Sequence, residues 1–238
     1  MLQTKTIPYF DGDVRLQGHL AFDDAGSGAL PGVLIAHSWV GRSDFFMEKA
    51  QKLAELGYAG FALDMYGDAK LGAGAEQCSA LMMPFIEDRV MLQRRMGCAL
   101  DALRDQPEVD AARIAVIGFC FGGLCALDLA RTGADLRGAV SFHGLFKPPG
   151  NTQGNAIKAK VLVLHGHDDP MVPVDDVLQL EQELTEAGAD WQIHVYGNTM
   201  HAFTNPEAND PAFGTVYNAA ADKRSWQSLV NFLAEAFN

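Results

Sequence analysis

The sequence predicts an α/β fold in which a mostly parallel central sheet carries helices on both faces. Three observations support this prediction. Short apolar runs alternate with helical periodicities from about residue 31 onward. The apolar runs are nearly continuous, as in strands that are buried on both faces. An antiparallel hairpin opens the chain, which a closed barrel of alternating strands and helices would not explain. The composition, with 48% hydrophobic and 20% charged residues, is that of an ordinary globular protein.

The opening hairpin is predicted over Lys5–Phe10 and Val14–Phe22, where apolar and polar residues alternate. Asp11-Gly12-Asp13 between them is typical of a tight turn. The later strands are predicted where apolar residues form short runs. These runs are Pro31–Ala36, Tyr58–Leu63, Arg113–Gly118, Gly138–Phe142, Val161–Leu164 and Trp191–Tyr196.

Helices are predicted where apolar residues recur with a period near 3.6 and a glycine or a polar residue marks an end. The predicted helices are Asp44–Leu56, Glu76–Met82, Pro84–Asp105, Phe121–Thr132, Val174–Ala187 and Asn218–Phe237. The glycine-rich stretch Tyr66–Ala75 is predicted to be a loop. No repeat or long linker divides the chain, so we expect residues 1–238 to form one domain.

The charge and the cysteines exclude several classes of function. A net charge of −12 disfavours nucleic acids and anionic membranes as partners. Neither a membrane-spanning run nor an apolar signal core is present, so we expect a cytoplasmic protein. None of the four cysteines forms a C-x-x-C pair, which argues against a zinc knuckle or a thioredoxin-type site. The oligomeric state, monomer or homodimer, is left open.

Cys120 is the strongest candidate for a reactive residue. It lies in Gly118-Phe119-Cys120-Phe121-Gly122-Gly123, where a predicted strand runs directly into a predicted helix. A nucleophile on so sharp a turn takes a strained backbone conformation, and glycines two positions away on either side avoid collisions. The first N–H groups of the helix then stabilise negative charge at the sulfur. The alternatives are a buried structural cysteine and a dinucleotide loop, for which the second glycine of G-x-G-x-x-G is missing.

Asp169 and His201 are the predicted partners of this cysteine. A nucleophile needs a base, and the base needs an orienting carboxylate. Asp169 and His201 follow the last two predicted strands, and open α/β sheets place their sites beyond such strand ends. Asp169 is preferred over its neighbour Asp168 because it precedes Pro170. The chain order of nucleophile, acid and histidine is that of a hydrolase triad.

The stretch before Pro170 also offers a metal-binding alternative. His165, His167 and Asp169 form H-x-H-x-D, a spacing used in two-metal hydrolases. The histidine expected directly after that aspartate is replaced by Pro170. We therefore expect no metal and no other cofactor.

With these residues identified, the chain resembles the dienelactone hydrolase (carboxymethylenebutenolidase-like) family of α/β-hydrolases over nearly its whole length. A cysteine in place of serine at the strand-to-helix turn distinguishes that family. The resemblance implies an α/β-hydrolase fold and the cofactor-free hydrolysis of a small ester or lactone through a thioester intermediate. It rests on the stretch 118–123 and on Leu63-Asp64-Met65-Tyr66-Gly67, Ser141-Phe142-His143-Gly144, His165–Pro173 and His201-Ala202-Phe203.

The resemblance also implies a role for each site residue. Cys120 attacks the carbonyl carbon, and His201, held by Asp169, moves the protons. The backbone N–H groups of Trp39 and Phe121 form the oxyanion hole. The residues expected by placement to line the substrate pocket are Ser38, Tyr66 and His143.

Two positions differ from the best-known family members. Ser38 stands where those members have a glutamate that controls the protonation of the cysteine, so His201 alone would activate Cys120. Asn205 stands where they have an arginine for the substrate carboxylate. Together with the negative charge of the chain, these differences favour neutral esters as substrates.

Three other functions are compatible with the sequence. A thioesterase or a general carboxylesterase would use the same triad. A non-catalytic binder or thiol sensor could be built on the same fold. The complete set of three reactive groups favours an enzyme, because a binder has no need to keep them.

Overall fold

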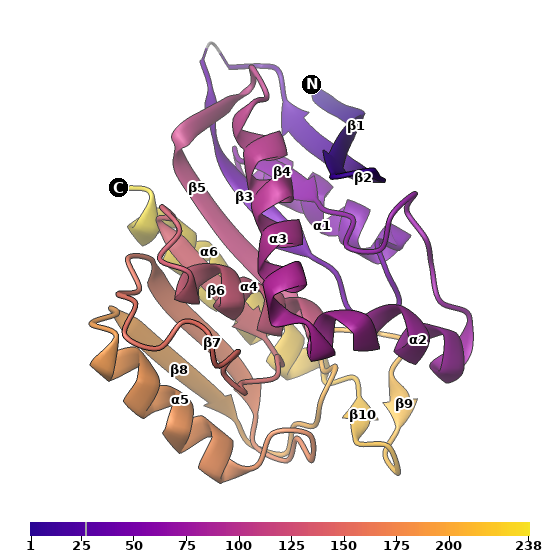
Figure 1. The fold of residues 1–238 in the computed structure, drawn as a ribbon, viewed down its shortest axis with the longest axis vertical. Coiled ribbons are helices and arrows are strands. Elements are labelled where there is room, and N and C mark those ends of the chain that lie inside the picture. Colours follow the sequence, from indigo (N-terminus) through magenta and orange to yellow (C-terminus); the bar gives the residue numbers. More distant parts are fainter. Residues whose placement is uncertain (27) are drawn as a thin grey trace. The chain divides into compact units, whose positions relative to one another are not determined.

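The computed structural model describes residues 1–26 and 28–238. The chain divides into two compact units, Met1–Ile117 and Gly118–Asn238, each built of strands and helices (Figure 1). The predicted α/β class with an antiparallel N-terminal hairpin is confirmed. That residues 1–238 form one domain stays a prediction.

The first unit starts with the hairpin and continues with parallel strands. Strands β1 and β2 form an antiparallel pair, in which Leu2 lies opposite Asp23 and Asp11 lies opposite Val14. Strand β2 is antiparallel to β4, and β4 is parallel to β3, so the order is β1-β2-β4-β3-β5. The elements are β1 (Leu2–Asp11), β2 (Val14–Asp23), β3 (Leu30–Ala36), α1 (Asp44–Glu55), β4 (Ala59–Ala62), α2 (Gly74–Glu87), α3 (Arg89–Arg104) and β5 (Val109–Phe119), whose last residues belong to the second unit.

The second unit begins with the last residues of β5 and has three parallel strands in the order β6-β7-β8. Its elements are α4 (Phe121–Arg131), β6 (Gly138–Phe142), β7 (Lys160–Gly166), α5 (Val174–Glu186), β8 (Trp191–Tyr196), the short β9 (Asn209–Asp210) and β10 (Thr215–Val216), and α6 (Ala219–Ala236). The short antiparallel pair of β9 and β10 was not predicted.

Helices cover both faces of β6, as the close surroundings of two glycines show. A Cβ at Gly138 would lie 2.7 Å from the Phe232 ring of α6, and a Cβ at Gly123 of α4 would lie 2.6 Å from Ser141 Oγ. Residues 138 and 141 are an odd number of positions apart, so their side chains point to opposite faces of the strand. Helices α4 and α6 therefore cover opposite faces of β6.

Helix α4 is buried along its whole length and is anchored at its C-terminal end. Arg131 donates to both carboxylate oxygens of Glu183 on α5, at 2.8 and 2.7 Å, and to Asp128 at 3.1 Å. It also donates to the Phe146 carbonyl at 2.8 Å. This guanidinium is 2% exposed, and the two carboxylates compensate its charge inside the protein.

One predicted helix boundary was wrong. We expected a helix to begin at Pro84, but Pro84 lies inside α2 and the break between α2 and α3 falls at Asp88. The Asp88 carboxylate accepts the Met91 N–H at 2.9 Å and so caps α3. The new helix therefore begins at Arg89, five residues later than the proline suggested. Strand β5 begins at Val109, four residues earlier than predicted.

Among residues 1–26 and 28–238, no helix is both long enough and apolar enough to cross a membrane.

Candidate active site

Cys120 lies at a strained turn directly between β5 and α4. Its φ of 57° is in the left-handed region, which non-glycine residues rarely adopt, and its side chain is half-buried. Cys120 N–H donates to the Phe142 carbonyl at 3.0 Å, which ties the turn to β6. A Cβ at Gly118 would lie 1.9 Å from the Gly122 carbonyl oxygen, so the turn excludes any side chain there. This close contact explains why a glycine is needed two residues before the cysteine, as predicted from the sequence.

Asp169 and His201 meet inside the second unit, as a bonded pair. His201 Nδ1 lies 2.7 Å from Asp169 Oδ2, and both side chains are almost completely buried. Asp169 also accepts the Met171 N–H at 2.9 Å, which fixes the carboxylate for the imidazole. Asp168 is exposed, so the preference for Asp169 agrees with the geometry.

Cys120 also influences the His201 ring. His201 Nε2 is buried and has no nitrogen or oxygen partner among residues 1–26 and 28–238. Burial of His201 favours the neutral ring, but interactions with Cys120 and with Asp169 outweigh it and raise the pKa of His201 to about 10. The His201 ring therefore interacts with a carboxylate and with a cysteine, the two partners that the histidine of a cysteine nucleophile needs.

A loop that the sequence did not single out holds both members of the pair. His201 N–H donates to the Gly214 carbonyl at 2.9 Å, and the His201 carbonyl accepts the Val216 N–H at 3.1 Å. A Cβ at Gly214, whose φ is 83°, would lie 2.1 Å from the Pro170 ring. The loop before β10 thus packs on the residue after Asp169 while it fixes the backbone of His201.

His143, predicted to line the pocket, lies beside the imidazole of His201. The two ring centroids are 5.2 Å apart in an edge-on arrangement. His143 Nε2 is 2.8 Å from Thr204 Oγ1, and Thr204 was not among the predicted site residues. Phe121, a predicted oxyanion donor, is the first residue of α4, so its N–H belongs to the positive end of that helix.

The remaining predicted residues, Ser38, Trp39 and Tyr66, come together in the first unit. Tyr66 is buried, and its hydroxyl donates to the Trp39 carbonyl at 3.0 Å. The Ser38 carbonyl lies 2.7 Å from His37 Nδ1. His37 was not among the predicted site residues, although it directly precedes them and ends an apolar run.

The residues of the alternative metal motif do not converge. Among residues 1–26 and 28–238, no three His, Cys, Asp or Glu side chains are grouped so that they could hold a metal ion. Asp169 faces His201, while His167 is exposed and His165 is buried against the Phe146 ring at 5.5 Å. Burial lowers the pKa of His165.

Comparison with known proteins gives consistent matches. The model of the dienelactone hydrolase family matches residues 17–237. A crystal structure of a dienelactone hydrolase-like promiscuous phosphotriesterase from metagenomic libraries is 40% identical, with a TM-score of 0.94 over 100% of this chain and 99% of that one. A Yersinia pestis relative, provisionally described as a carboxymethylenebutenolidase, is 27% identical over 97% of this chain and 86% of its own.

A more distant structure confirms the fold alone. An α/β-hydrolase from a Medee basin deep-sea metagenome library is 18% identical, with a TM-score of 0.69 over 98% of each chain. The predicted α/β-hydrolase fold is therefore confirmed.

Proposed function

Because the chain belongs to the dienelactone hydrolase family, we propose that it hydrolyses small esters or lactones with a triad of Cys120, His201 and Asp169. One observation carries the proposal. The buried His201 ring contacts Asp169 at 2.7 Å through Nδ1, while Cys120 acts on the same ring and raises its pKa. Nucleophile, base and orienting acid are thus present in the order that acyl transfer requires.

The proposed reaction has two halves. Because the pKa of His201 is raised to about 10, its ring holds the thiol proton near pH 7, and the Cys120 sulfur attacks the carbonyl carbon as a thiolate. The tetrahedral intermediate then expels the alkoxide, which takes the proton from His201. The resulting thioester is attacked by a water molecule whose proton passes to His201. Collapse of this second intermediate releases the acid and restores the Cys120 thiolate beside the protonated His201 ring.

Two backbone N–H groups are proposed to stabilise the oxyanion. The Phe121 N–H lies at the N-terminus of α4, where the helix dipole favours negative charge. The Trp39 N–H belongs to the loop after β3. Each such donor contributes about 10²–10³ to the rate in enzymes of this mechanism.

The proposed substrates are neutral. Asn205 carries no charge, and its side chain accepts the Glu207 N–H at 3.1 Å, so it supports a turn. Ser38, Tyr66 and His143 remain the proposed pocket residues. A thioester or a simple carboxylic ester would be cleaved by the same mechanism, because both present a carbonyl carbon to the sulfur.

This proposal predicts a preference for uncharged esters. We expect p-nitrophenyl acetate to be hydrolysed with a kcat/KM at least about tenfold above that of the anionic mono-p-nitrophenyl succinate, because the net charge is −12 and Asn205 offers no cation. The acetyl group should appear on the Cys120 peptide in mass spectrometry of acid-quenched samples. Turnover without any Cys120 adduct, or equal rates for both esters, would contradict the proposal.

A neutral phosphotriester is a second candidate substrate, favoured by the 40% identity to a promiscuous phosphotriesterase over the whole chain. The Cys120 sulfur would attack phosphorus and displace p-nitrophenolate from paraoxon, leaving a phosphorylated sulfur for water to cleave. We expect slow turnover of paraoxon, measured as the release of p-nitrophenolate. We also expect p-nitrophenyl acetate to compete with paraoxon for the same site. Turnover that persists after Cys120 is alkylated would place this activity elsewhere.

A further inference from the structure

The peptide group between Ser38 and Trp39 is held by its carbonyl. The Ser38 carbonyl oxygen lies 2.7 Å from His37 Nδ1 and accepts the Gly41 N–H at 3.2 Å. This peptide is trans, so its C=O and N–H point in opposite directions. Two bonds to the carbonyl therefore fix the direction of the Trp39 N–H, which is a proposed oxyanion donor.

The tautomer of His37 follows from its second contact. His37 Nε2 accepts the Met65 N–H at 3.1 Å, so the ring hydrogen must lie on Nδ1 and be donated to the Ser38 carbonyl. Burial lowers the pKa of His37 to about 4, so the ring is neutral near pH 7. His37 thus acts as a fixed donor rather than as a titrating base.

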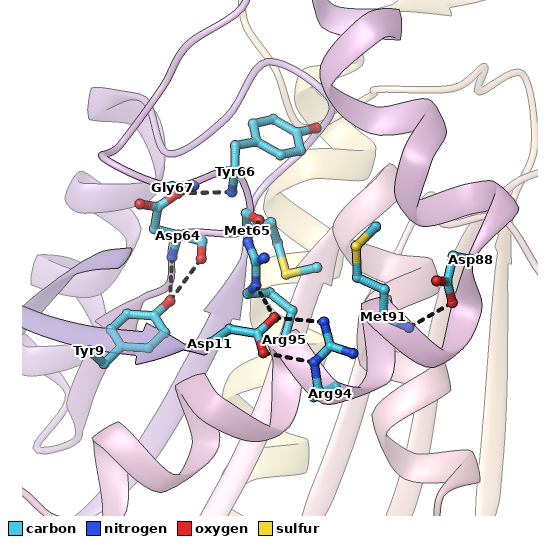
Figure 2. Close-up of polar contacts among 10 residues, drawn as sticks. All are labelled: Tyr9, Asp11, Asp64, Met65, Tyr66, Gly67, Asp88, Met91, Arg94 and Arg95. Atoms are coloured by element: carbon cyan, nitrogen blue, oxygen red, sulfur yellow. Dashed lines mark hydrogen bonds and ion pairs between the residues drawn. The ribbon is translucent and has the colours of Figure 1, made fainter. Parts of the chain in front are cut away.

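Met65, whose N–H orients His37, is itself held through its carbonyl from outside the loop (Figure 2). Arg95 donates to the Met65 carbonyl at 2.6 Å and to Asp11 at 2.8 Å. Arg94 binds the same Asp11 carboxylate, through Nε at 2.7 Å. An ion-pair cluster at the end of β1 therefore supports the segment after β4.

Tyr66 holds the next peptide, between Trp39 and Val40. Its hydroxyl donates to the Trp39 carbonyl at 3.0 Å, and its own N–H donates to Asp64 Oδ1 at 2.9 Å. The Asp64 carboxylate, 1% exposed, also accepts N–H groups from Gly67 at 2.9 Å and Ala69 at 2.8 Å. Figure 2 shows Asp64 between Tyr66 and the hydroxyl of Tyr9.

We propose that His37 and Tyr66 are positioning residues, which hold the peptides on either side of Trp39 and so fix the direction of its N–H. The inference rests on the proposed function, in which the Trp39 N–H is a donor. This role does not require the Tyr66 hydroxyl or His37 to touch the substrate. They hold the peptide in place before the reaction, so that no free energy is spent on reorienting it during each acylation.

The test compares two reactions of the same sulfur. Acylation by p-nitrophenyl acetate passes through an oxyanion, whereas alkylation by iodoacetamide forms a sulfur–carbon bond, releases iodide and forms no oxyanion. In Tyr66→Phe we expect the acylation rate and kcat to fall about tenfold, less than the loss of about 10²–10³ that follows removal of a donor, because the Trp39 N–H remains. Alkylation and KM should change by less than about twofold.

Two further variants keep the test falsifiable if one protein fails to fold. His37→Phe should lower acylation about 100-fold, and His37→Asn should recover most of that loss because the Asn amide can still donate to the Ser38 carbonyl. Tyr217→Phe is the matched control, since its hydroxyl contacts Asp222 on α6 at 3.2 Å, and we expect unchanged rates.

The outcomes separate this inference from the proposed function. Equal losses of acylation and alkylation in Tyr66→Phe would show an effect on the cysteine itself and would overturn the inference. Unchanged acylation in both Tyr66→Phe and His37→Phe would also overturn it. If the unaltered chain is not acylated on Cys120, the proposed function fails. The acylation of the unaltered chain is therefore measured before that of any variant.

Discussion

Replacing Cys120 by alanine is expected to lower ester hydrolysis by about 10⁴-fold or more, because the covalent step is lost and no other group can take its place. The fold should survive, since alanine has the same Cβ as cysteine and meets the same backbone conformation at a φ of 57°. Circular dichroism and the midpoint of thermal unfolding check the fold, and steady-state assays with p-nitrophenyl acetate check the activity.

The same variant has a second expected signature. Interaction with Cys120 is among the causes that raise the pKa of His201 to about 10, so removal of the sulfur should lower that pKa, which imidazole NMR signals followed across pH would report. Cys98→Ala is the matched control, since Cys98 is also half-buried but lies on α3. If Cys120→Ala still turned over the ester, Cys120 could not be the nucleophile.

Asp169→Asn is expected to lower kcat by about 10⁴-fold, the loss typical when the carboxylate that orients a catalytic histidine becomes an amide. An Asn side chain can present its NH₂ group to His201 Nδ1 and so stabilise the wrong tautomer. Asp169 also raises the pKa of His201, so that pKa should fall as well.

The neighbouring aspartate provides the control for this prediction. Asp168→Asn makes the same chemical change one residue earlier, on an exposed side chain, and should leave kcat within about twofold. A large loss in Asp168→Asn with normal activity in Asp169→Asn would reverse the assignment of the acid.

The local parts of the site could be predicted from the sequence. The turn at Cys120 depends on residues within a few positions, because Gly118 must pack against the Gly122 carbonyl. The choice of Asp169 over Asp168 rested on the proline that follows, and the burial of Asp169 agrees with it. Strand ends carry the reactive groups in any open parallel sheet, which is why their order along the chain was informative.

The contacts between distant segments could not be predicted in this way. His37 depends on the Met65 N–H, which is brought to it by the parallel register of β3 and β4. The boundary at Asp88 depended on a competition between a proline and a side-chain cap, and the burial of Phe85 keeps the helix intact past Pro84. Local pattern does not decide such a competition, because tertiary packing overrides propensity.

The anchoring of α4 has a consequence for how proteins of this design can diverge. Cys120 precedes the first residue of α4, and Arg131 at the last residue is bonded to Glu183 on α5. A rigid helix transmits any axial shift from one end to the other, so relocating α5 during evolution would move the nucleophile with it. New substrate ranges are then more accessible through loop changes than through rearrangement of α5. In directed evolution, libraries that spare Arg131 and Glu183 should retain a larger share of active members.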